Sequence, residues 1–173
     1  GKSSLLVTLG NFFFHLSYAI PIPADEIKLP LVDFIYFSTD VNRKSQEGLS
    51  SFGSEIYELN QYVKINDRFG LYLIDEFARG TNPFEGEAFC TSILKYLREK
   101  DALTICVTHY SSPTKLKGLE HFQVIGLSNI DKEQLKKELE SINRFEDRLK
   151  LLNIKMDYRL KKVTEIDEVP REA

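Results

Sequence analysis

The chain has 173 residues, of which 42% are hydrophobic and 28% are charged. This length and balance are typical of one folded domain and exclude a disordered or collagen-like chain. The net charge of −3 argues against a basic surface over the whole domain, although it does not exclude a local site for nucleic acid. Two cysteines, Cys90 and Cys106, are too few for a disulfide framework or a zinc ribbon, so we expect two small buried residues in a reducing compartment.

The first predicted element is a helix over residues 1–19. Its apolar run from Leu5 to Ile20 also fits a signal peptide, which stays open as an alternative, and is short for a membrane span. Polar residues recur along one face of such a helix and apolar residues along another. The polar positions are Ser4, Thr8, Asn11, His15 and Tyr18, and the apolar positions are Leu5, Leu9, Phe12 and Leu16. This pattern favours an amphipathic helix of a folded domain.

Strands and helices then alternate along the chain. Three prolines between residues 21 and 30 mark a connection before a predicted strand at 32–37, and a polar loop follows at 40–48. The next predicted elements are a helix at 51–66, a strand at 71–74, a helix at 86–100, strands at 103–107 and 122–127, a helix at 131–152 and a strand at 156–161. This alternation predicts an α/β fold with a mostly parallel sheet.

Gly1-Lys2-Ser3 has the residue types that end a phosphate-binding loop. In such a loop the glycine lets backbone N–H groups approach the phosphates, and the following helix begins with the positive end of its dipole. The lysine would reach the β- and γ-phosphates, and the serine hydroxyl would bind Mg²⁺. The tripeptide alone is a weak signal, because the first glycine of the motif is not among these residues.

Asp75 and Glu76 follow a short apolar strand, and His109 follows the next one. Ligands of parallel α/β sheets bind at the carboxyl ends of the strands. Asp75 would there hold Mg²⁺ through its water shell, and Glu76 would orient or deprotonate an attacking water. His109 would contact the γ-phosphate or that water. The alternatives are an exposed acidic strand end and a structural histidine.

Ser50 and Ser51 precede a predicted helix that has Glu55 in its first turns. In one interpretation these residues cap the helix, because hydroxyl and carboxylate groups bond the free backbone groups of a first turn. In the other, the same hydroxyls and N–H groups hold a phosphate, which need not belong to the same subunit.

Taken together, these segments resemble the ATPase domain of the MutS family, an ABC-class P-loop fold. The matching segments are Gly1-Lys2-Ser3-Ser4 for the end of Walker A, Tyr18-Ala19-Ile20-Pro21 leading into Asp33-Phe34-Ile35, Ser50-Ser51-Phe52 with Glu55 for the signature, Asp75-Glu76 with Arg79-Gly80-Thr81 and Gly86 for Walker B and the D-loop, and Thr108-His109-Tyr110 for the switch. The resemblance is specific over residues 1–110 and loose over 122–173.

The resemblance implies a three-layer P-loop fold and an ATPase whose cofactors are ATP and Mg²⁺. Gly1, Lys2, Ser3 and Ser4 would hold the nucleotide, with Ser3 and Asp75 on the metal. Glu76 would activate water and His109 would sense the γ-phosphate. It also implies a homodimer in which Ser50 and Ser51 reach the partner's nucleotide, while Arg79, Gly80 and Thr81 couple the two sites. ATP would close this dimer and ADP would release it.

Three parts of the chain depart from the family pattern. Phe77-Ala78 replaces the usual apolar-glycine pair after the Walker B acids. The predicted helix at 131–152 resembles an insertion, either a solvated helix packed on the domain or a docking surface for a partner. The chain begins inside the phosphate-binding loop and ends at 170–173, where the family begins a C-terminal helical element. We therefore expect residues 1–173 to be a fragment of such a domain.

The resemblance leaves the cellular role open between two kinds of partner. One is DNA mismatch repair or related DNA binding in the cytoplasm, with DNA contacted by domains outside this chain. The other is remodelling of a client protein, because a similar MutS-like ATPase occurs beside aminomutases, where reactivation is plausible. A third alternative is a binding module that switches on nucleotide without turnover. No membrane role is expected.

Overall fold

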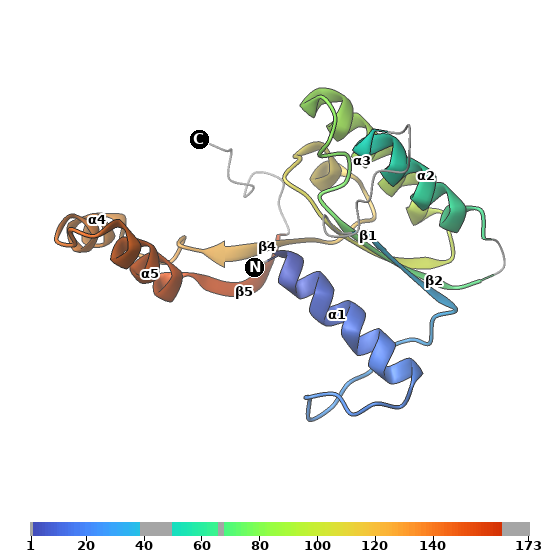
Figure 1. Ribbon diagram of the computed structural model, residues 1–173, viewed down its shortest axis with the longest axis horizontal. Coiled ribbons are helices and arrows are strands. Elements are labelled where there is room, and N and C mark those ends of the chain that lie inside the picture. The colour runs from blue at the N-terminus through green and yellow to red at the C-terminus, as the bar shows by residue number, and fades with distance from the viewer. Residues whose placement is uncertain (1, 39–49, 66–67, 164–173) are drawn as a thin grey trace. The chain divides into compact units, whose positions relative to one another are not determined.

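A computed structural model describes residues 2–38, 50–65 and 68–163, and the chain divides into two compact units (Figure 1). The larger unit covers residues 2–119, and the smaller one begins at Glu120. Gly1 and the predicted C-terminal helical element at 170–173 lie outside the described residues. In the described part of the chain, no helix is both long enough and apolar enough to cross a membrane.

Within its described residues, the larger unit contains a parallel sheet of three strands with two crossover helices. In chain order its elements are α1 (Lys2–Ser17), β1 (Phe34–Ser38), α2 (Ser51–Val63), β2 (Gly70–Asp75), α3 (Pro83–Arg98), β3 (Ala102–Val107) and a 3₁₀ helix (Ser112–Lys115). The strand order is β1-β2-β3, and both pairings are parallel. The α/β class and the parallel sheet predicted from the sequence are confirmed for this unit.

Side chains of the sheet alternate between two hydrophobic clusters, as the twofold period of a strand requires. Leu71 and Leu73 of β2 pack with Leu6 and Phe13 of α1. Tyr72 and Ile74 face the other way, in a cluster with Leu59 of α2 and with Cys90, Leu94 and Leu97 of α3. Helices therefore cover both faces of the sheet and make three layers. All six residues of β2 are buried, as expected for a central strand covered on both faces.

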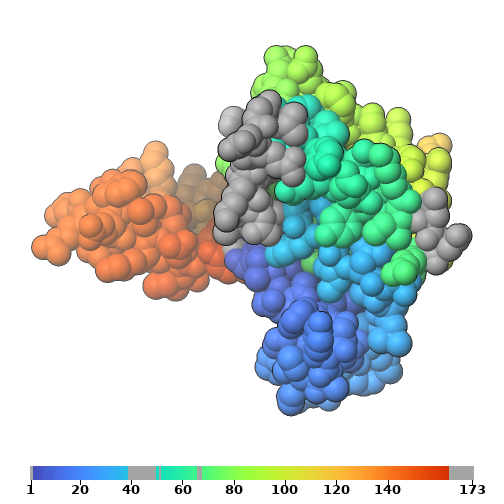
Figure 2. Space-filling model, turned by 45° about the vertical axis from the view of Figure 1, so that its right-hand side comes forward, coloured from blue at the N-terminus to red at the C-terminus, as the bar shows by residue number. Residues whose placement is uncertain are grey.

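The boundaries of the two crossover helices follow local chemistry. The Ser50 hydroxyl accepts a hydrogen bond from the Gly53 N–H at 3.0 Å and caps α2. Asn82 caps α3 by accepting from the Phe84 N–H, and Pro83 occupies the first turn, so α3 begins three residues before the predicted start. The two helices meet where the rings of Phe52 and Phe89 lie 5.1 Å apart, and Figure 2 shows both helices at the surface of this unit.

Helix α1 is amphipathic as predicted, but its deepest residues differ from the expected ones. Four of the five predicted polar positions are exposed, and His15 is half-buried. The predicted apolar positions are half-buried, whereas Leu6 and Phe13 are fully buried. Gly10 explains the close approach of this face to the sheet, because a Cβ there would lie 3.1 Å from Leu73 Cδ1.

The smaller unit contains a two-stranded antiparallel ribbon and a pair of helices. Its described elements are β4 (His121–Gly126), α4 (Lys132–Glu140), α5 (Phe145–Lys155) and β5 (Asp157–Val163), with β4 paired to β5. These two strands form a sheet of their own, separate from the parallel one. The expectation of a mostly parallel sheet therefore applies to the larger unit only.

The predicted single helix over 131–152 is wrong, because residues 141–144 are not helical. Asp131 caps α4 by accepting from Glu133 N–H and Gln134 N–H, and Glu146 and Asp147 favour a new helix start at α5. An ion pair of 2.6 Å between Lys155 and Glu138 joins the two helices. The heptad-like apolar spacing continues across the break, so periodicity alone could not reveal it.

Candidate active site

The carboxyl ends of β2 and β3 lie side by side and carry the predicted acids and histidine. Asp75 is the last residue of β2 and is in register with Val107 at the end of β3. The Glu76 N–H donates to the Val107 carbonyl at 2.8 Å, so the two loops leave the sheet together. This pairing brings Glu76 close to His109, two residues beyond β3.

The Glu76 carboxylate contacts two basic side chains. Its Oε1 lies 2.6 Å from His109 Nε2, and its Oε2 lies 2.8 Å from Arg79 Nη1. Lys2 Nζ of α1 lies 3.3 Å from the other histidine nitrogen, Nδ1. The same Lys2 Nζ lies 3.5 Å from His109 Nε2, so Lys2 lies beside both ring nitrogens of the histidine. Four predicted site residues thus form one connected cluster.

Asp75 is buried, and its Oδ1 has no hydrogen-bond partner among the described residues. A buried carboxylate oxygen without a partner is costly, so this atom is suited to hold a cation or a water shell. By strand alternation Asp75 shares the face of Leu71 and Leu73, which pack against α1. The alternative of an exposed acidic strand end is wrong, because Asp75 is buried and only 18% of the Glu76 side chain is exposed.

The donor set fits Mg²⁺ as the family resemblance implies. Magnesium takes one or two protein oxygens and completes its shell with water and phosphate. Among the described residues there is no group of three or more histidine, cysteine, aspartate or glutamate side chains that could enclose a metal. Asp75 therefore offers one buried carboxylate oxygen of the type that magnesium accepts as a ligand, and the exposed hydroxyl of Ser3 is the other ligand that the resemblance leads us to expect.

The loop after β2 has an unusual backbone. Glu76 and Ala78 have φ angles of 50° and 64°, in the left-handed region that non-glycine residues rarely adopt. The resemblance leads us to expect glycine at position 78, and glycine would adopt this left-handed conformation without strain. Ala78 is fully buried, and its N–H donates to Glu55 Oε2 at 3.1 Å. Glu55 thus accepts from a backbone group outside α2, while the cap that one of the two sequence interpretations expected is made by Ser50.

Neighbouring atoms lie so close to Gly86 that no side chain fits at this position. A Cβ at this position would lie 2.3 Å from the Tyr110 hydroxyl oxygen and 2.9 Å from the Ala78 carbonyl oxygen. The Tyr110 hydroxyl donates to that carbonyl at 3.4 Å. One residue further on α3, Glu87 accepts from the Ser112 N–H at 2.6 Å and from the Ser111 hydroxyl. These hydrogen bonds lower the pKa of Glu87 and tie the loop after β3 to α3.

Most of the other predicted site residues that the structure describes lie at the surface of the larger unit. Ser50 is an exposed helix cap, and the Thr81 hydroxyl donates to Glu85 Oε2. Gly80, Ser3 and Ser4 are exposed. Gly1 and the side chain of Ser51 lie outside the described residues. Of the three residues expected to couple the sites, Arg79 pairs with Glu76 among the contacts of the described residues.

The two cysteines are free and lie near the second loop. Cys90 is buried in α3, with its sulfur 4.0 Å from the Thr108 hydroxyl, and Cys106 of β3 is half-buried. A hydrogen bond between the two thiols lowers the pKa of Cys90 and raises that of Cys106. The expectation of two buried thiols is met fully at Cys90 and partly at Cys106.

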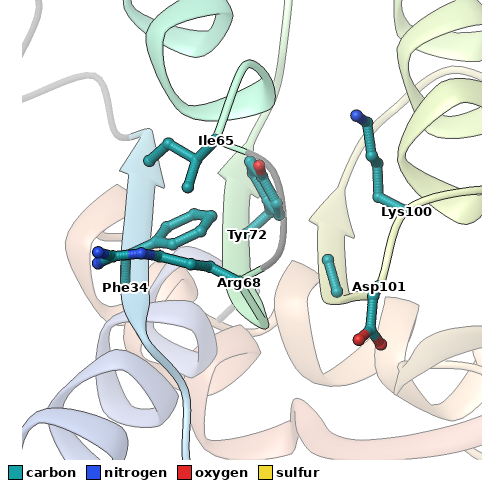
Figure 3. A pocket seen from close by; sticks show the side chains of 7 residues that line it. Phe34, Ile65, Arg68, Tyr72, Lys100 and Asp101 are labelled. Atoms are coloured by element: carbon teal, nitrogen blue, oxygen red, sulfur yellow. The ribbon is translucent and has the colours of Figure 1, made fainter.

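A hollow of about 470 Å³ lies at the opposite edge of the sheet, near the starts of the strands (Figure 3). Phe34 of β1 and Ala102 of β3 line it together with the side chains of Arg68 and Lys100. None of the predicted site residues lines this hollow. It is therefore distinct from the cluster at the carboxyl ends of the strands.

The α/β fold of the larger unit agrees with the comparison to known families. The family description "MutS domain V" matches residues 1–172, so the chain belongs to the MutS family through this domain.

Curated relatives support the same assignment. The chain is 35% identical to "Endonuclease MutS2" of Aquifex aeolicus (strain VF5) over 67% of its own length and 15% of the relative. It is 32% identical to "DNA mismatch repair protein MutS" of Streptococcus suis (strain 98HAH33) over 77% of its length and 16% of the relative. A third match, 34% identical, is "Endonuclease MutS2" of Lactococcus lactis subsp. cremoris (strain MG1363), over 78% of this chain and 18% of the relative. The chain thus spans less than a fifth of these relatives.

Proposed function

We propose that this chain is a Mg²⁺-dependent ATPase domain of ABC-class P-loop architecture. The observation that carries the proposal is the Glu76 carboxylate, which lies between His109 and Arg79 with Lys2 beside the histidine. Three of these residues come from the positions that hold nucleotide chemistry in parallel α/β sheets, namely two strand ends and one helix N-terminus. Membership of the MutS family supports the same conclusion.

In the proposed reaction Glu76 accepts a proton from the attacking water. The water oxygen forms a bond to the γ-phosphorus, the bond from that phosphorus to the bridging oxygen breaks, and ADP leaves. Lys2 and the N-terminus of α1, with Gly1, Ser3 and Ser4, bind the phosphates, while His109 senses the γ-phosphate. Mg²⁺ on Ser3 and Asp75 would neutralise developing charge on the phosphate oxygens.

We further propose that two copies of the chain complete each other's sites. Ser50 and Ser51 would hold the partner's nucleotide, and Arg79, Gly80 and Thr81 would couple the sites. The exposed positions of Ser50 and Arg79 are compatible with such an interface. The names of the curated relatives favour work on DNA, in mismatch repair or a related process, over remodelling of a client protein.

Replacing Lys2 with alanine is expected to weaken ATP binding by about tenfold to a hundredfold. A charge-assisted hydrogen bond to a phosphate is worth about 1.5–3 kcal/mol. Calorimetry with ATP and Mg²⁺ on the natural full-length protein measures the effect. Lys28→Ala is the matched control, because Lys28 pairs with Glu26 on a remote loop. Equal affinity in the Lys2 variant would contradict the proposed phosphate site.

Mixing two inactive variants tests the shared site. Ser50→Ala and Lys2→Ala subunits are each expected to be inactive as homodimers, whereas an equimolar mixture should recover about a quarter of the wild-type rate, because a mixed two-fold dimer has one intact composite site. Steady-state phosphate release measures the recovery. No recovery at any mixing ratio would show that Ser50 does not act across a dimer.

A further inference from the structure

In the loop that carries Glu76, the backbone N–H and C=O groups of Ala78 (the Ala78 peptide) are both held by hydrogen bonds from other parts of the chain. Both polar groups of a buried peptide need partners, and a left-handed alanine persists only where its surroundings hold it in place. Ala78 is 0% exposed and lies two residues beyond Glu76, which is itself left-handed. The position of the Glu76 side chain therefore depends on whatever fixes this peptide.

Two side chains from different elements hold the Ala78 peptide. Glu55 of α2 accepts from its N–H at 3.1 Å, and Tyr110, next to His109, donates to its carbonyl at 3.4 Å. The second Glu55 oxygen accepts from the Ser38 hydroxyl at the end of β1, at 3.4 Å. Glu55 is only 4% exposed. A carboxylate at such depth costs several kcal/mol unless hydrogen bonds offset its lost hydration.

The Tyr110 contact requires the neighbouring glycine. A Cβ at Gly86 would lie 2.3 Å from the Tyr110 hydroxyl oxygen, so any larger residue there would displace the tyrosine. Burial raises the pKa of Tyr110, so its hydroxyl keeps its proton and remains a donor. The following residues are held on α3 through Glu87. The loop after β3 thereby reaches Glu76 by two routes, directly through His109 and indirectly through Tyr110 and Ala78.

We infer that Glu55 and Tyr110 are positioning residues, which fix Glu76 by holding the Ala78 peptide between α2 and the loop after β3. If the N-terminus of α2, which carries Ser50, moves, Glu55 moves with it. Because Glu55 holds the Ala78 peptide, this displacement would also shift Glu76. This inference deepens the proposed function and rests on it, because it assigns to Glu76 the activation of water. It adds two residues that touch neither phosphate nor water.

The first test compares Glu55→Ala with Glu55→Gln. The alanine variant is expected to lower kcat by on the order of 10²-fold at unchanged KM, because small misplacements of a reacting group have effects of that size. Glutamine keeps an oxygen that accepts from the Ala78 N–H, and its amide can donate to Ser38, so it should restore most of the rate. Glu58→Ala, an exposed glutamate on the same helix, is the control and should match the wild type.

A readout without nucleotide separates this inference from the proposed function. The His109 ring contacts Glu76, so its NMR signals should shift in Glu55→Ala and in Tyr110→Phe. They should not shift in Glu58→Ala or in Tyr57→Phe, because Tyr57 is an exposed tyrosine of α2. If the wild-type protein hydrolyses no ATP, the proposed function fails and these signals alone decide the inference. Unshifted His109 signals, an unchanged kcat in Glu55→Ala, or a loss of rate that glutamine does not rescue would each overturn it.

Discussion

Replacing Glu76 with glutamine is expected to lower the rate of ATP hydrolysis by about 10²–10⁴-fold, which is the usual contribution of a general base. Glutamine keeps the size of the side chain and can still accept from His109 Nε2, so the loop should retain its conformation. What it loses is the capacity to take a proton from water. ATP binding should therefore change little, while phosphate release in steady state falls.

The control for this experiment is Glu26→Gln. Glu26 is an exposed carboxylate paired with Lys28 on the connection after α1, and its loss should leave the rate unchanged. A Glu76→Gln variant that hydrolyses ATP at the wild-type rate would contradict the general-base role. A variant that loses ATP binding as well would indicate that Glu76 acts mainly through the arrangement of Arg79 and His109.

Leu73→Ala is expected to lower the free energy of unfolding by about 2–5 kcal/mol, the range for removal of a buried leucine side chain. Leu73 is 0% exposed and lies in the cluster between the sheet and α1. Its Cδ1 is close enough to Gly10 that a Cβ there would come within 3.1 Å. The cavity would open beneath the helix that carries Lys2, and little flexible structure is available to fill it.

Urea unfolding followed by circular dichroism measures this loss, because the chain has no tryptophan to report it by fluorescence. Leu31→Ala is the matched control, since Leu31 is 81% exposed, and a change within about 0.5 kcal/mol is expected there. Equal effects at the two leucines would show that the cluster against α1 contributes no special stability.

Much of the larger unit could be predicted because its signals are local. The apolar run of β2 and the helical spacing after Ser51 give elements whose existence the structure confirms, with boundaries shifted by at most three residues. The position of Asp75, Glu76 and His109 at the carboxyl ends of neighbouring strands could be predicted, because ligand sites of parallel sheets follow from sheet topology. The contacts between these residues depend on the register of β2 against β3, which no local sequence pattern predicts.

What sequence reasoning missed depends on contacts between distant residues. Glu55 and Ala78 are 23 residues apart, and their hydrogen bond involves a backbone group that has no signature in the amino-acid letters. The sequence shows that alanine, not glycine, is at position 78, but it does not show that this residue has a left-handed backbone conformation. In the smaller unit, the apolar spacing ran unbroken through residues 141–144 and concealed the division into α4 and α5.

The burial of β2 on both faces has a consequence for how the larger unit opens. Leu73 and Ile74 are neighbours in the chain but belong to different hydrophobic clusters. All three strands contribute side chains to both clusters, but freeing β2 would break both parallel pairings at once, whereas β1 and β3 each have one pairing among the described residues. Local opening is expected to begin at the outer strands. Proteases should then cleave near β1 or β3 first. Cleavage within β2 is expected only when the whole unit unfolds.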